Sequence, residues 1–187
     1  MKKILSIAVV LLIALTAYSQ EQELSKKEKK KLEKELRKEQ EAKDAEMKSQ
    51  VVAVMVEYQR FVLEADRLRD SKGNQVNVSP TLNFVANDSI TGVIQIGSNS
   101  YVGMNGVGGI TAEGPISNYK YTFNEKSKSY NVSYNIRSTL GNYDVRMTIF
   151  SDGRADATIS STWPGQLNYS GYVVPPIQSR VYKGTSY

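Results

Sequence analysis

The chain has 187 residues with 24 Lys or Arg, 19 Asp or Glu and neither cysteine nor histidine, which excludes disulfides, zinc sites built on Cys or His, cysteine nucleophiles and Ser-His-Asp triads. The formal net charge is +5, but both signs are interleaved along the chain, whereas a nucleic-acid-binding protein typically carries a one-sided basic stripe. We therefore expect one domain with appendages, and no nucleic-acid partner, cofactor or metal.

Residues 1–19 have the pattern of a signal peptide. Two lysines precede an apolar run over residues 4–17, and Ala17 and Ser19 supply small residues at the −3 and −1 positions of a cleavage site. The run is too short for a comfortable membrane span, and no cysteine follows it that could be lipidated. We expect cleavage after Ser19 or Gln20 and a mature protein that is periplasmic or secreted, with no stable membrane span.

Residues 20–46 are expected to form a charged helical arm. They contain no Gly or Pro and consist almost wholly of strong helix formers. Opposite charges stand four residues apart in the favourable order at Glu33/Arg37 and Glu39/Lys43. The apolar residues are too sparse for a sustained coiled-coil seam, so we interpret the segment as a solvated arm. The alternative is a weak coiled coil or a helix that docks an envelope protein partner.

A β-rich domain is expected over residues 47–187, with an amphipathic helix at its start. Apolar side chains recur at helical spacing from Met47 to Val62, which predicts a helix to about Gln59 that packs this stripe on the sheet. Because residues 51–56 are rich in valine, a strand is the alternative.

Beyond residue 60 the apolar residues recur with a period of two, and turn signals recur about every ten residues. The predicted fold class is mainly β, an antiparallel β-sandwich or partly open barrel preceded by a long charged N-terminal helix. Nine strands are predicted, over residues 61–69, 75–78, 81–86, 89–97, 107–124, 129–139, 143–150, 155–162 and 166–174.

The parity of the apolar positions predicts the registers of the last five strands. Directly opposed residues share a face, so a change of parity needs an even-numbered loop and unchanged parity needs an odd one. This predicts a four-residue loop at 125–128, a two-residue turn at 141–142, and three-residue loops at 151–153 and 163–165. All five strands then present one apolar, tyrosine-rich face and one polar face.

Six tyrosines define that face, which makes it a candidate site for an apolar or glycan ligand, because tyrosine rings stack on sugars and line apolar cavities. The face also holds Ile136, Val145 and Met147, so core packing is the favoured role. The six are Tyr119, Tyr121, Tyr130, Tyr134, Tyr143 and Tyr169.

Residues 103–109 are rich in glycine. They lack the lysine and Ser/Thr of a P-loop and the spacing of a dinucleotide fingerprint, so a bulge or tight connection is the favoured interpretation. A ligand that approached the backbone there would meet Asn105 and Glu113 as the nearest polar groups.

Two carboxylates, Glu64 and Asp66, stand two apart on one predicted strand and therefore share a face. Together with Glu113 they could serve acid/base chemistry. Ion pairing with Arg67 and Arg69 is the favoured alternative.

A family resemblance rests on three segments, FVLEADRLRDSKGNQVNVSPTLNFV, NGVGGITAEGPISNYK and SGYVVPPIQSRVYKG. They resemble the domain of unknown function 4251 family, small exported proteins of Gram-negative gut bacteria, over roughly residues 45–187. The resemblance implies a β-rich exported domain and brings no activity and no catalytic residues. Bacteria of this kind O-glycosylate exported proteins at Asp-Ser/Thr-apolar sites, which makes Ser89 a candidate; a turn between strands is the alternative.

The function expected from these patterns is a non-enzymatic exported cell-envelope binding or interaction module of unknown ligand. The alternative is a carboxylate-dependent hydrolase acting on envelope polymers or glycans. A cavity in the tyrosine face would favour binding, and carboxylates facing each other across a cleft would favour hydrolysis.

The signal-peptide pattern predicts the start of the mature chain. Protein purified from the periplasm or medium should begin at Gln20 or Glu21, because the small residues at positions 17 and 19 fit a signal peptidase site. Intact-mass analysis measures this directly, and a mass that retains residues 1–19 would contradict it.

Overall fold

The structure, a computed structural model, describes residues 26–98, 103–161 and 165–186. The chain forms two compact units, of which the first ends at Asp44 and the second spans Ala45–Tyr187. The predicted signal peptide and the first two residues of the predicted loop at 163–165 lie outside the described residues.

One long helix, α2 (Lys26–Glu57), begins the described chain and confirms the predicted charged helix. Its side chains from 28 to 43 are exposed. The expected pair Glu39/Lys43 forms at 2.8 Å, while Arg37 pairs with Glu41 at 3.3 Å instead of with Glu33. Such exposed pairs add only a few tenths of a kcal/mol each.

The last three turns of α2 belong to the second unit and carry two apolar faces. Val52, Met55 and Val56 are buried in the core. Met55 packs inward as predicted. The prediction that the rest of the helical stripe packs on the sheet is wrong, because Val54 and Tyr58 are exposed. The helix ends two residues before the predicted position, where Gln59 adopts a φ of +56° and turns the chain into the first strand.

Nine strands follow among the described residues, as predicted, and every pairing between them is antiparallel. A short 3₁₀ helix, η1 (Pro176–Gln178), follows the last strand. The strands are β1 (Arg60–Asp70), β2 (Gln75–Asn77), β3 (Phe84–Asp88), β4 (Thr91–Ile96), β5 (Ile110–Asn124), β6 (Ser129–Ser138), β7 (Gly141–Phe150), β8 (Arg154–Ser161) and β9 (Gln166–Val174).

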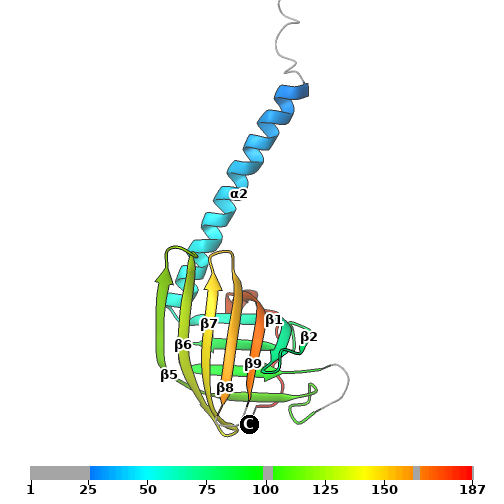
Figure 1. The fold of residues 1–187 in the computed structure, drawn as a ribbon, viewed down its shortest axis with the longest axis vertical. Coiled ribbons are helices and arrows are strands. Elements are labelled where there is room, and N and C mark those ends of the chain that lie inside the picture. Colours follow the sequence, from blue (N-terminus) through cyan, green and yellow to red (C-terminus); the bar gives the residue numbers. More distant parts are fainter. Residues whose placement is uncertain (1–25, 99–102, 162–164, 187) are drawn as a thin grey trace, which may run out of the picture. The chain divides into compact units, whose positions relative to one another are not determined.

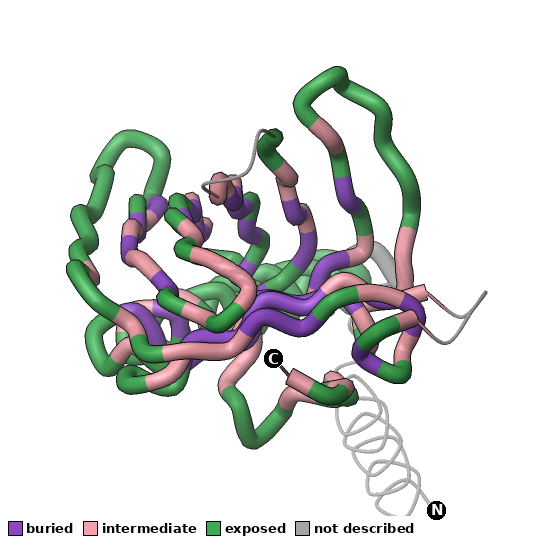
Figure 2. Tube along the Cα trace, turned by 90° about the horizontal axis from the view of Figure 1, so that it is seen from below, coloured by how far each residue is buried: buried purple, intermediate pink, exposed green. Residues whose placement is uncertain are grey.

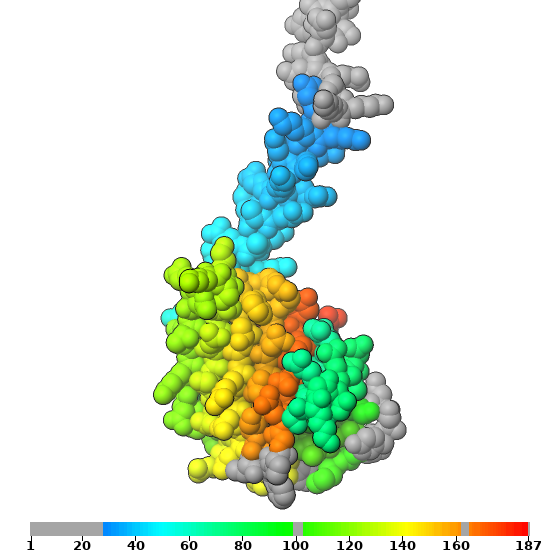
Figure 3. Space-filling model, viewed as in Figure 1, coloured from blue at the N-terminus to red at the C-terminus, as the bar shows by residue number. Residues whose placement is uncertain are grey.

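The sheet closes on itself, so the fold is a closed barrel of eight strands rather than a sandwich or a partly open barrel. β1 pairs with β9 along nearly its whole length. On its other side β1 pairs with β3 through residues 60–64 and with β2 through residues 67–69. Figure 1 shows β5 to β9 side by side in chain order, with β1 and β2 beyond β9, and Figure 3 shows the β1–β2 hairpin, in teal, lying against β9, in orange.

The predicted registers hold for two of the loops and shift in the other two. Asn124 pairs with Ser129, which confirms the four-residue loop. Ile149 pairs with Ala155, as the three-residue loop at 151–153 requires. The two-residue turn lies at Thr139-Leu140 instead of 141–142. A three-residue loop at 163–165 would place Ile159 opposite Tyr169, whereas Ile159 pairs with Leu167. Both shifts move the register without changing parity, so the same residues still share a face.

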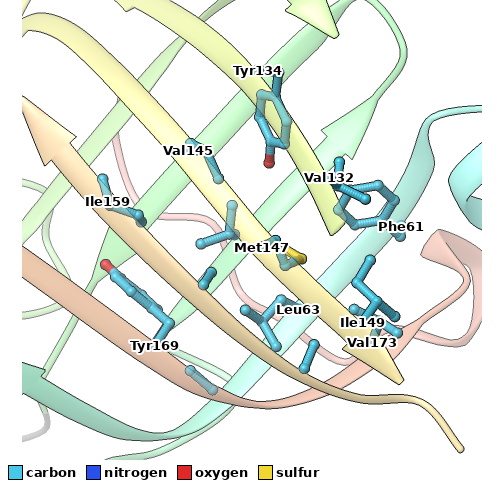
Figure 4. Close-up of a cluster of buried hydrophobic side chains, with 14 of the residues drawn as sticks. Phe61, Leu63, Val132, Tyr134, Val145, Met147, Ile149, Ile159, Tyr169 and Val173 are labelled. Atoms are coloured by element: carbon cyan, nitrogen blue, oxygen red, sulfur yellow. The ribbon is translucent and has the colours of Figure 1, made fainter. Parts of the chain in front are cut away.

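The barrel interior is filled by the predicted apolar face. Figure 4 shows side chains of β1, β6, β7, β8 and β9 converging there, including Leu63, Met147 and Tyr169. A second, smaller cluster lies on the other face of β1, β3 and β4, where Val62, Phe84 and Val93 pack with Val181 of the C-terminal tail. Burial concentrates in the middle of the strands, while their turns are exposed (Figure 2).

The loop after β7 yields a stability prediction. Gly153 has a φ of +88°, and an added Cβ would meet only the Val173 carbonyl oxygen, at an ordinary 3.6 Å. Gly153→Ala should therefore cost about 1 kcal/mol through backbone strain alone. Gly153→Asn should cost less, because asparagine enters this region more readily. Urea unfolding measures both losses, and an alanine variant as stable as the wild type would refute the strain.

Candidate functional site

The tyrosine-rich face lies inside the barrel. Tyr134 is 2% exposed and Tyr169 0%, so both are part of the core. Tyr119, Tyr130 and Tyr143 are half-buried and pack against that core. Only the remaining member of the six, Tyr121, is exposed, and it lies near the open tip of the β5–β6 hairpin.

The interior tyrosines contact one another and the end of α2. The Tyr119 and Tyr134 rings stack with their centroids 5.8 Å apart. The Tyr119 hydroxyl donates to the Val56 carbonyl oxygen at 2.8 Å, which ties β5 to the last turn of the helix. Burial raises the pKa of the Tyr119 phenol, and the neighbouring Tyr121 adds to the effect. These contacts give the tyrosines a packing role in the barrel.

Tyr134 has an unusual polar environment. Its hydroxyl and the Asn87 amide nitrogen are buried without a hydrogen-bond partner among the described residues. Burial raises the pKa of Tyr134, Tyr119 adds to this, and the nearby Asn87 side chain offsets it in part. Both residues are at most 2% exposed, so we interpret the two groups as a polar contact within the packed interior.

One cavity opens onto the tyrosine face at the end of the barrel. It has a volume of about 270 Å³ and is lined by Tyr143, Tyr169, Ile94 and Ile159, among other residues. This volume lies below the usual range of small-molecule sites, about 300–1,000 Å³. The Tyr169 hydroxyl, which donates to the Gln95 carbonyl oxygen at 3.3 Å, is already satisfied.

Asn105, predicted near a ligand, instead organises the glycine-rich connection before β5. It is 1% exposed. Its side-chain oxygen accepts the Val107 and Gly109 amides at 3.1 and 2.9 Å. Its amide donates to Thr111 at 3.0 Å, and its backbone carbonyl accepts the Thr185 amide at 2.9 Å. The segment 103–109 is a tight connection, and β5 begins three residues later than predicted.

The predicted carboxylates hold the C-terminal tail or a neighbouring arginine. Glu64 accepts the Ser179 hydroxyl and the Arg180 amide at 2.8 and 2.9 Å. Glu113 pairs with Lys183 at 2.7 Å.

The hydrogen bond from Lys183, followed by that from Ser186, holds the pKa of Glu113 below its ordinary value. Asp66 pairs with Arg67 at 3.2 Å, as the ion-pairing alternative predicted. Each carboxylate therefore has a structural partner of its own.

The candidate glycosylation residue, Ser89, lies in the exposed turn between β3 and β4. It has a φ of +79°, and the Asp88 carboxylate accepts the Ile90 and Thr91 amides at 3.0 and 2.6 Å. The predicted turn is therefore present. Ser89 is exposed, and its glycosylation stays a prediction.

A large hollow of the second unit is a groove that the sequence did not indicate. It has a volume of about 1040 Å³, and helix α2 and η1 form its walls. We call this hollow the apolar groove; it is lined chiefly by Met47, Val51, Val54, Tyr58, Arg60 and the segment 175–177. Its apolar residues are unusually open to solvent: Tyr58 is 64% exposed and Ile177 95%.

The sequence holds a partial signal for the apolar groove. The helical stripe from Met47 to Tyr58 is visible in the spacing, but the spacing alone favours packing on the sheet. Residues 175–177 carry no functional pattern of their own. The missing information is that α2 buries its other face, with Val52 and Val56, against the barrel.

Two classes of site are not found in the part of the chain that the structure describes. No group of three or more acidic side chains there lies close enough together to hold a metal ion. Among the same residues, no helix combines the length and apolarity that a membrane crossing requires.

The second unit is thus a small closed antiparallel barrel with the apolar groove on its outside. The sequence pattern of DUF4251, a domain of unknown function, matches residues 38–173, and the chain belongs to this family. It is similar to a crystal structure of a DUF4251 family protein from Bacteroides eggerthii, with 28% sequence identity and a TM-score of 0.61 over 75% of this chain and 96% of that chain. Comparison with curated proteins finds no match.

The buried tyrosines predict a loss of stability at alkaline pH. The ordinary pKa of tyrosine is 10.0, and burial raises it for Tyr134 and Tyr169. Both phenols then stay neutral in the folded protein at a pH that ionises them in the unfolded chain. The contribution of these two phenols to stability should be constant below pH 10 and fall above it by about 1.4 kcal/mol per pH unit for each.

Tyr134→Phe should halve the part of this slope that the two tyrosines contribute. It should cost little at pH 8, because the lost hydroxyl has no partner among the described residues. Urea unfolding at pH 8, 10 and 11 measures both effects, with the exposed Tyr172 changed to Phe as the control. An unchanged alkaline slope in Tyr134→Phe would contradict the buried-phenol explanation.

Proposed function

We propose that this protein is a non-enzymatic binding module of the cell envelope that holds an apolar ligand in the apolar groove. The observation that carries the proposal is the gathering of exposed apolar side chains from two segments far apart in the sequence, Val54 and Tyr58 on α2 and its end, and Ile177 on η1. Single exposed apolar residues are normal on protein surfaces, whereas a contiguous patch marks an interaction site.

The walls of the apolar groove are preformed. The opposite face of α2 is fixed by Val52 and Val56, which are at most 2% exposed. The facing wall contains Pro175 and Pro176, whose rings restrict the backbone, and the chain after it is held to Glu64 through Ser179. A ligand would therefore pay little ordering entropy, which favours binding at a site of this kind.

The alternative function, a hydrolase, receives less support from the same contacts. Its candidate carboxylates Glu64, Asp66 and Glu113 are each occupied by partners within the chain. The predicted glycan site on the tyrosine face loses support too, because most of those rings are interior. Export remains part of the proposal on the strength of the signal-peptide pattern, and the charged arm remains a candidate contact for an envelope partner.

A neutral fluorescent probe, N-phenyl-1-naphthylamine, tests the groove. The wild type should enhance its fluorescence, and Val54→Asp should weaken binding at least about tenfold, because the substitution places a charge on the groove wall. Ile90→Asp is the matched control, since Ile90 is an exposed apolar residue of the β3–β4 turn and should leave binding unchanged. Equal binding by wild type and Val54→Asp would refute the groove as the binding site.

A further inference from the structure

The apolar groove contains one charged side chain, Arg60, among the described residues that line it. Arg60 begins β1 directly after the turn that ends α2, and it is exposed. Its partner in the β1–β3 register is an acidic residue, Asp88. The Asp88 carboxylate, however, accepts the amides of Ile90 and Thr91.

No carboxylate of the described residues lies within 4.0 Å of the Arg60 guanidinium in an ion pair. The other exposed arginines of the second unit include Arg67 and Arg154, which pair with Asp66 and Asp152 at 3.2 and 2.7 Å. Four further arginines are exposed and, like Arg60, form no ion pair among the described residues: Arg69, Arg137, Arg146 and Arg180. Arg60 differs from these four because it lines the apolar groove, so it is the cation that a ligand in the groove would meet.

We propose that the apolar groove binds a long-chain carboxylate, with its hydrocarbon chain between α2 and η1 and its carboxylate on the Arg60 guanidinium. This inference rests on the proposed function and names its ligand class. An otherwise uncharged apolar wall suits an alkyl chain, and a single unpaired cation beside it suits one anionic group. A neutral hydrocarbon would leave Arg60 unused, and a polar anion would leave the walls unused.

Arginine favours a carboxylate through its geometry as well as its charge. The planar guanidinium offers two parallel N–H donors that match the two carboxylate oxygens. Lysine would keep the charge but lose this fork. Along the chain, each buried methylene should strengthen binding roughly fourfold, so affinity should rise from octanoate to dodecanoate. The volume of about 1040 Å³ lies at the upper end of small-molecule sites, which leaves room for the longer chain.

The test compares dodecanoate with 1-dodecanol, which has the same chain and no charge. Both are titrated at submicellar concentration as competitors of N-phenyl-1-naphthylamine on the full mature chain. The wild type should bind dodecanoate at least about tenfold more tightly than 1-dodecanol. Arg60→Gln should remove this preference and leave the affinity for 1-dodecanol unchanged, while Arg60→Lys should keep part of it. Arg69→Gln, an exposed arginine of the same strand, is the control that should change neither affinity.

The outcomes separate the two proposals. Equal affinity of the wild type for both competitors overturns the carboxylate inference and leaves the apolar groove as a binding site. Failure of the probe and of both competitors to bind overturns the inference and the proposed function together. Association with anionic phospholipid vesicles without binding of submicellar dodecanoate would show a membrane surface as the partner and overturn the inference. The wild-type comparison needs no variant, so misfolding of Arg60→Gln would not leave the question open.

Discussion

The pairing of β1 with β9 is the constraint on which the rest of the structure depends. It joins the first strand of the chain to the last, so the backbone groups along their shared edge are paired with each other instead of being left open. Closure also turns the apolar face of β6 to β9 inward, where Tyr134 and Tyr169 become core residues. The interior is filled, and the apolar groove lies outside the barrel, beside the end of α2.

Much of the fold can be predicted because hairpins are local. The parity of apolar residues determines which side chains share a face, and the three-residue loop ending at Gly153 follows from it. Parity does not determine where along the strands a turn lies. The turn before β7 lies two residues earlier than predicted, and the β8–β9 register is also displaced by two residues. Parity cannot predict that the barrel closes, because β1 and β9 are far apart in the sequence and no turn between them sets their register.

The site is harder to predict than the fold for a related reason. Asn105, Glu113 and Glu64 stand out in the sequence as polar groups near a glycine-rich segment or on one strand face. The partners of Glu113 and Glu64 lie in the C-terminal tail, some 70 to 115 residues away, and the tail also donates to the Asn105 backbone carbonyl. The spacing along the chain contains no sign of these contacts. The groove wall on α2 is visible as a periodic stripe, but a helix with two apolar faces needs a structure to show which of them packs against the barrel.

Polar residues outside the apolar groove hold one of its walls in place. Gln95, which is buried, donates to the Tyr182 carbonyl oxygen at 2.8 Å and accepts the Gly184 amide at 2.8 Å. Glu64 holds the tail at Ser179, one residue after η1 ends. Because the tail is anchored at these points, Ile177 is held in place at 95% exposure instead of collapsing onto the sheet. The buried amides and the groove wall therefore form one structural unit, in which the anchored tail keeps an apolar side chain exposed.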